Sequence, residues 1–148
     1  MDKIYINERK LSMYKLTKTS FIIHELRITK NNLAPGNYQL KPYITRQIGK
    51  LKESVYFTKL FLSIENTPDQ PFPVNITVDF RGIFEFKDII DETRVFDFLK
   101  IQAVQIMYPY LNSTVTNLSI NAMMPPIVLP IIDAANLFKN NEETTYIN

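Results

Sequence analysis

The chain has 148 residues, of which 45% are hydrophobic and 22% charged, and we predict one globular domain over residues 1–148. It contains no cysteine, which excludes disulfide bonds, a thiolate nucleophile and a cysteine-based zinc site. The net charge of +2 is divided unevenly, because residues 1–60 carry 12 Lys+Arg against 4 Asp+Glu and the remainder carries 5 against 11. The basic residues are spread singly among apolar ones, so we predict no nucleic-acid binding.

We predict neither a signal peptide at the N-terminus nor a membrane-spanning segment elsewhere in the sequence. Charged and apolar residues alternate through residues 1–18, without the apolar run of a signal peptide. The most apolar stretch, residues 95–111, contains Asp97 and Lys100, whereas a membrane span needs about 20 nearly uncharged residues. We therefore expect a cytoplasmic protein with no integral membrane segment.

Four segments in the first half have the pattern of β-strands. Residues 21–28 form a short segment with several β-branched side chains, which predicts a strand. Residues 38–48 predict a weaker strand at an open sheet edge, because Pro42 cannot donate a ladder hydrogen bond. Residues 55–64 are apolar on both faces, which is typical of a central strand. Residues 74–80 alternate apolar with polar side chains, as a half-buried strand does.

The second half is predicted to be mainly helical. Asp91 and Glu92 supply a cap and negative charge at the start of a helix that we expect to end near Asn121. Pro109 removes a backbone hydrogen bond, which predicts a kink or break near Tyr108. An apolar, proline-rich loop at 123–130 and a short helix over about 131–139 are expected to follow. Strands first and helices afterwards indicate an α+β fold with helices packed on an antiparallel sheet.

A series of short motifs resembles the SecB family of protein-export chaperones. The motifs are Arg81-Gly82-Ile83-Phe84 after the half-buried strand, Met107-Tyr108-Pro109-Tyr110 in the long helix, Met124-Pro125-Pro126-Ile127-Val128-Leu129-Pro130, and Asn136-Leu137-Phe138. Their order and spacing agree with the family across about residues 55–139. The resemblance implies a four-stranded antiparallel sheet packed with a long, kinked helix and a shorter C-terminal helix, assembled as a dimer of dimers. It also implies a cytoplasmic holdase that binds unfolded client polypeptides without a nucleotide or metal cofactor.

The resemblance also implies a peptide-binding groove bordered by the second strand, the long helix and the loop after it. The residues at these places are Leu40, Tyr43, Ile44, Met107, Tyr108, Leu111, Met123, Met124, Ile127, Val128 and Leu129. Flexible thioethers and amphipathic aromatics adapt to many apolar side chains, and an open sheet edge offers main-chain hydrogen bonds. The alternative interpretation is that these residues fill the core or a subunit interface.

The sequence does not distinguish between two roles of client binding, delivery to SecA and protection of an antitoxin. In the SecB family, acidic sheet residues and an acidic tail dock on the translocation motor SecA, and here Thr77 stands at the acidic strand position while the tail offers only Glu142-Glu143. Some SecB-like proteins instead protect an antitoxin in toxin–antitoxin–chaperone systems, and the Tyr-Pro-Tyr and Pro-Pro-Ile-Val-Leu patterns are similar to that branch as well.

Catalytic and metal sites are not predicted. His24 is the single histidine and lies in a predicted strand, and the three glycines are isolated rather than grouped in a phosphate-binding loop. The acidic residues Asp88, Asp91 and Glu92 are explained by the start of a helix. We predict a non-enzymatic protein; the alternatives are a structural or assembly subunit with one fixed protein partner, and a binder of a small apolar ligand.

Overall fold

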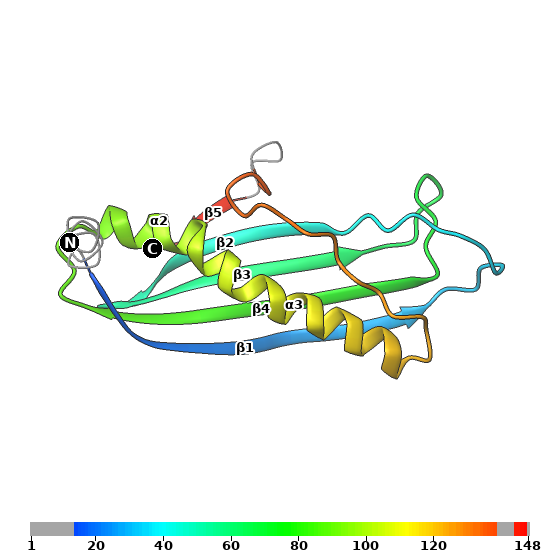
Figure 1. Cartoon of the computed structure of the whole chain (residues 1–148), viewed down its shortest axis with the longest axis horizontal. Coiled ribbons are helices and arrows are strands. Elements are labelled where there is room, and N and C mark those ends of the chain that lie inside the picture. The colour runs from blue at the N-terminus through cyan, green and yellow to red at the C-terminus, as the bar shows by residue number, and fades with distance from the viewer. Residues whose placement is uncertain (1–13, 139–143, 148) are drawn as a thin grey trace, which may run out of the picture.

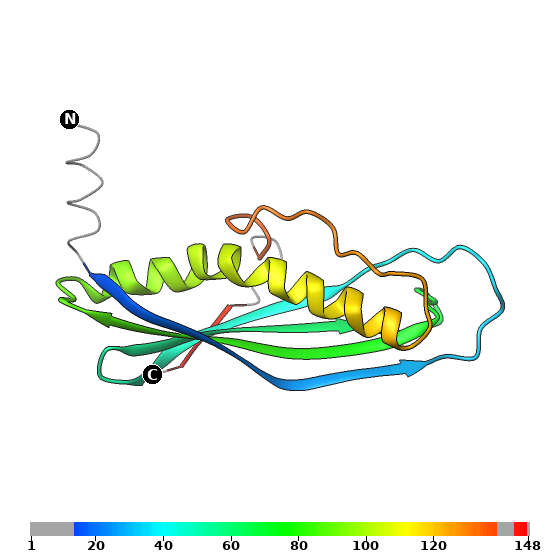
Figure 2. The same cartoon turned by 60° about the horizontal axis from the view of Figure 1, so that its bottom comes forward.

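The computed structural model describes residues 14–138 and 144–147, which form one five-stranded sheet and two consecutive helices (Figure 1). The elements are β1 (Lys15–Lys30), β2 (Tyr43–Lys52), β3 (Val55–Ile64), β4 (Val74–Lys87), α2 (Glu92–Lys100), α3 (Gln102–Asn121) and β5 (Thr144–Ile147). The strand order is β1-β4-β3-β2-β5. Figure 2 shows that α2 and α3 lie along one face of the twisted sheet.

The four long strands pair antiparallel with their neighbours, and β5 adds to β2 in parallel. This arrangement confirms the predicted α+β fold with a four-stranded antiparallel sheet, and β3 is central as expected. The sheet edge that we predicted to be open at the second strand is occupied in part by β5. The second strand also begins later than predicted, at Tyr43, because Pro42 has no N–H for a ladder.

The core lies between the helices and the sheet face that they cover. Every second residue of β4 is buried, starting with Val74, and the residues between them point to the other face. Leu99 of α2 and Met107 of α3 are fully buried against this face. The strand continues through the Arg81-Gly82-Ile83-Phe84 motif, which we had expected to follow it.

Gly82 allows the long helix to approach the sheet. A Cβ atom at this position would lie 2.8 Å from Cε2 of Phe84 and 2.9 Å from Sδ of Met107. These separations are shorter than van der Waals contact, so a larger residue would displace the buried ring or the helix side chain. The glycine therefore fixes the spacing between β4 and α3.

The helical stretch is interrupted at Ile101, a position that the sequence did not predict. α3 continues through Pro109, so the expected feature near Tyr108 is not a break in the helix. At the interruption, sheet side chains bind the carbonyls at the end of α2: Thr58 Oγ1 donates to the Leu99 carbonyl at 2.8 Å, and Arg46 donates to that of Lys100. Pro109 lies on the exposed side of α3, where water can bind the carbonyl that lacks a helical donor.

The predicted short helix at about 131–139 is not formed by its described residues, and Lys139 lies outside them. Asp133 organises a turn instead. Its carboxylate accepts hydrogen bonds from the Ala135 backbone N–H at 3.0 Å and the Asn136 side chain at 2.6 Å. This local bonding competes with helix propagation, as is usual for Asp and Asn. None of the helices in the described residues combines the length and apolar character that a membrane crossing requires.

Candidate functional site

Residues 122–138, here named the return segment, run back beside α3 over the covered face of the sheet (Figures 1 and 2). The segment has no strand partner, and side chains of α3 bind its main chain. These bonds are Tyr108 Oη to the Pro130 carbonyl at 2.6 Å, the Leu129 N–H to Asn112 Oδ1 at 2.8 Å, Thr116 Oγ1 to the Ile127 carbonyl at 2.6 Å, and the Ile127 N–H to Ser119 Oγ at 2.9 Å. Residues 127–130 of the segment are thus held in place by one polar stripe of the helix.

Three prolines keep the return segment extended. Pro125, Pro126 and Pro130 have fixed φ angles and no backbone N–H, so neither helix nor a regular ladder can include them. Leu129 is buried and anchors the middle of the segment in the core. Met123, the second residue of the segment, has a φ of 62° and is 86% exposed.

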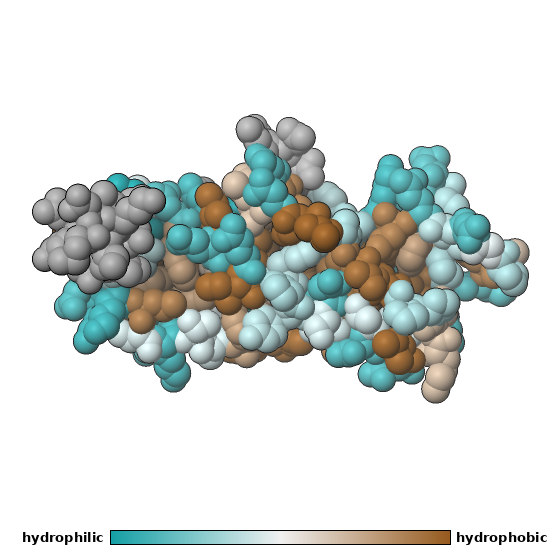
Figure 3. Space-filling view, viewed as in Figure 1, coloured by the Kyte–Doolittle hydropathy of each residue, from teal (hydrophilic) through white to brown (hydrophobic). Residues whose placement is uncertain are grey.

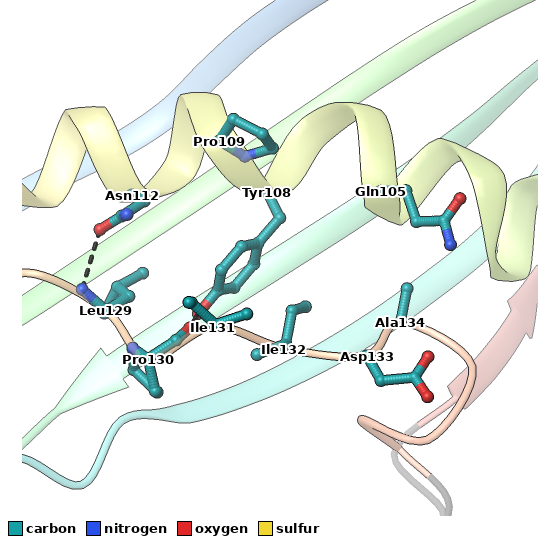
Figure 4. Close-up of a pocket in the computed structure, with 10 residues that line it drawn as sticks. All are labelled: Gln105, Tyr108, Pro109, Asn112, Leu129, Pro130, Ile131, Ile132, Asp133 and Ala134. Carbon is teal, nitrogen blue, oxygen red and sulfur yellow. Dashed lines mark hydrogen bonds between the residues drawn. The ribbon is translucent and has the colours of Figure 1, made fainter.

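A groove of about 520 Å³ lies between α3 and the return segment (Figure 4). It is lined by Gln105, Tyr108, Pro109 and Asn112 of the helix and by Leu129, Pro130, Ile131, Ile132, Asp133 and Ala134 of the segment. The Tyr108 ring points across the groove toward Pro130 and Ile131. Burial raises the pKa of Tyr108 to about 12, so its hydroxyl stays protonated and acts as a donor at neutral pH. The remaining lining is largely apolar.

The structure places the predicted peptide-binding residues in three environments. Tyr43, Met123 and Val128 are exposed, Leu40, Met124 and Ile127 are partly buried, and Ile44, Met107, Tyr108, Leu111 and Leu129 are buried in the core cluster. Only Tyr108 and Leu129 of this set line the groove. Tyr43 lines a second hollow of about 450 Å³ with Phe61 and Glu65 instead. The role of the whole set in client binding stays a prediction.

Sequence reasoning missed Ile131 and Ile132, which line the groove, because it assigned them to a helix. Ile131 is fully exposed to solvent, although an isoleucine is expected to be buried. Two sequence features would have indicated this site: an isoleucine pair directly after Pro130, and polar residues at helical spacing in Tyr108, Asn112 and Thr116. Figure 3 shows apolar side chains in patches along this face, over α3 and over the return segment.

The groove contains no acid–base or metal cluster. Asp133 is its one acidic lining residue, and it is engaged in the turn described above. In the part of the chain that the structure describes, no three His, Asp or Glu side chains gather in a way that would hold a metal ion. The site is suited to contact with apolar groups and main-chain amides.

Comparison with known proteins decides the family. The family model of the preprotein translocase subunit SecB matches residues 24–145. The chain belongs to the SecB family. This result confirms the resemblance that the sequence motifs indicated, and the SecB-like chaperone family is not enzymatic.

The SecB-family chain is similar to proteins from bacteria and an archaeon. It is 24% identical over 120 residues to the protein-export protein SecB of Zymomonas mobilis, covering 77% of this chain and 73% of that protein. It is 36% identical over 72 residues to an uncharacterized protein of Methanocaldococcus jannaschii, and the match spans 48% of this chain and only 45% of that protein.

A solved structure shares the fold. The SecB-like chaperone of Mycobacterium tuberculosis, in complex with a ChAD peptide from the HigA1 antitoxin, aligns with a TM-score of 0.67 and 12% identity. The alignment covers 86% of this chain and 96% of that chain. The α+β architecture predicted from the sequence is therefore that of a SecB-like chaperone.

Proposed function

We propose that this SecB-family protein is a chaperone that holds unfolded polypeptides, with the exposed apolar side chains of the return segment and the groove between this segment and α3 as its client-binding site. The observation that carries the proposal is the exposure of Met123, Val128 and Ile131 on a segment that is itself firmly bonded to the helix. Exposed apolar side chains that gather on one segment, rather than standing singly, are typical of a surface that meets a partner.

The physical basis is weak, repeated apolar contact. Each client side chain that is buried supplies about 1.5–3 kcal/mol before ordering costs, so several such contacts hold a long segment without a fixed sequence. Met123 and Met124 add flexible thioethers, which adapt to different partners. Membership of the family supports this function for protein export or for protection of an antitoxin.

We also propose that the protein is a cytoplasmic homo-oligomer, a dimer of dimers as the resemblance implied. The support is an apolar surface along β1, here named the β1 edge patch, formed by Phe21, Ile23 and Leu26 with Ile106 and Tyr110 of α3. Ile23 and Leu26 pair with Phe80 and Val78 and are exposed, and the Phe21 and Tyr110 rings lie 4.9 Å apart.

An antitoxin is better supported as a client than a preprotein delivered to SecA. The uncovered face of the sheet has no acidic surface among the described residues, because its carboxylates lie next to cations. Asp79 is 3.3 Å from Lys59, and Glu85 is 3.8 Å from Lys18. Thr77, at the position where the family carries an acid, accepts a hydrogen bond from Arg27 at 3.4 Å. We therefore expect no measurable complex with SecA in calorimetric titration, and binding to an unfolded antitoxin.

Light scattering of an aggregating client tests the proposed function. The wild-type protein should suppress aggregation at equimolar oligomer, and the variant M123D/V128D/I131D should lose most of this effect while its helical content is unchanged. Asp tolerates the positive φ at position 123, and the three sites are surface positions, so folding should not suffer. The matched control is L51D/I90D, which changes exposed apolar residues away from the groove. Failure of the wild-type protein to suppress aggregation contradicts the proposal.

A further inference from the structure

The outer edge of β2 is occupied by the chain's own C-terminal strand. β5 pairs in parallel with β2, with Arg46 opposite Thr144 and Gly49 opposite Ile147 (Figure 1). The other four strands pair antiparallel with one another, and none of these pairs involves β5. β5 therefore adds to a finished sheet by main-chain hydrogen bonds, which almost any extended polypeptide is able to provide.

The occupied edge adjoins the groove along the chain. The groove lining ends at Ala134, and Phe138 is buried four residues later with the guanidinium carbon of Arg46 4.2 Å from its ring centroid. Arg46 is also the residue at which pairing with β5 begins. A polypeptide leaving this end of the groove would reach the edge of β2 directly.

The pairing of β5 is short. It covers four of the ten residues of β2, whereas β3 pairs along nearly the whole strand on the other side. A strand of this length is close to the lower limit found in sheets. It is held near its site by its covalent connection, and a competing segment that makes more contacts is able to replace it.

We propose that the β2 edge from Arg46 to Gly49 is a strand-addition site for an extended client segment that runs parallel to β2, and that β5 is an internal occupant which the client displaces. This inference rests on the proposed function and specifies how the client main chain is bound. It predicts that the apparent client affinity equals the intrinsic affinity multiplied by the fraction of molecules in which the edge is open.

An engineered disulfide tests the displacement in a chain that has no native cysteine. Gln47 and Thr145 are direct partners, and neighbouring strands lie about 4.8 Å apart, within the Cα separation of a disulfide. Oxidised Q47C/T145C should bind a fluorescent unfolded client about tenfold more weakly than the reduced form, because the edge is then closed in every molecule. The single variant T145C should show no response to the reductant. Equal binding by both forms, or failure of the disulfide to form, overturns the inference.

The opposite change opens the edge. T145P/Y146P removes two backbone N–H groups from β5, and T145A/Y146A retains both as the matched control. The proline variant should bind the client about three to ten times more tightly than the wild type and lose hydrogen-exchange protection at residues 46–49 without client. Loss of protection without a gain in affinity contradicts the inference alone, whereas absence of client binding in every variant and in the wild type contradicts the proposed function.

Discussion

The side-chain oxygen of Asn112 lies 2.8 Å from the backbone nitrogen of Leu129 and accepts its hydrogen bond. Together with Tyr108, Thr116 and Ser119, it gives α3 a polar stripe that satisfies main-chain groups of the return segment. The segment consequently needs no secondary structure of its own to satisfy these groups, and its apolar side chains at Val128 and Ile131 are left exposed.

Removal of this bond should loosen the return segment. We expect N112A to lower the free energy of unfolding by about 1 kcal/mol, because the buried Leu129 N–H loses its acceptor. Hydrogen exchange at Leu129 should become faster, as measured by mass spectrometry. N112D retains an acceptor oxygen and is the matched control. Unchanged exchange at Leu129 in N112A would show that other contacts hold the segment.

The contact between Glu92 and Tyr56 should make stability depend on pH in the acidic range. Tyr56 donates to Glu92 at 2.6 Å and Lys50 donates at 2.9 Å, and these bonds lower the pKa of Glu92 below its ordinary value of 4.5. The stabilisation is therefore present above pH 4.5 and is lost as the pH falls through the lowered pKa. Between pH 5 and pH 3 the wild type should lose more unfolding free energy than E92Q.

Replacement of Tyr56 tests whether its hydrogen bond to Glu92 causes this pH dependence. Burial, and then the hydrogen bond to Glu92, raise the pKa of Tyr56 to about 12, so the phenol is protonated throughout the acidic range. Y56F removes the hydroxyl donor without removing the ring. In urea titrations, its loss of unfolding free energy between pH 5 and pH 3 should therefore be smaller than that of the wild type and closer to that of E92Q. An equal pH dependence in Y56F and the wild type would assign the effect to Lys50.

Gly82 provides a test of the spacing between helix and sheet. We expect G82A to lower the free energy of unfolding by about 1–3 kcal/mol, because the added methyl would overlap the Phe84 ring and the Met107 thioether. Gly36 is the matched control, since the nearest atom to a Cβ there is 3.9 Å away. Thermal unfolding measures both variants, and equal melting temperatures would show that the core absorbs the extra volume.

Much of the fold was predictable because local patterns decide it. β3 has the predicted bounds, and the alternation that begins at Val74 correctly gave β4 its buried face. The interruption at Ile101 was not predicted because no local pattern marks it; Thr58 and Arg46 satisfy the carbonyls there from distant strands. Contacts between segments far apart in sequence are not visible in periodicity.

The site was predictable only in outline for the same reason. Proline content and family resemblance located the return segment, but its path depends on bonds from Asn112 and Thr116 to residues more than ten positions away. The turn at Asp133 then placed Ile131 and Ile132 in the groove rather than in a helix. The pairing of β5 with β2 had no sequence pattern to indicate it.

The β1 edge patch should control assembly. Leu26 is 47% exposed in the single chain and lies on the helix side of an edge strand, so L26K should not disturb the core. It would place a charge in an interface between copies, where an unpaired cation is strongly unfavourable. In light scattering coupled to size exclusion, L26K should therefore give a smaller species than the wild type. The control I90K, at a site that is 72% exposed in the loop before α2, should not.

The dissociated L26K protein should retain binding to a short client peptide, because the groove between α3 and the return segment lies within one chain. Loss of that binding would mean that the site requires the neighbouring copy.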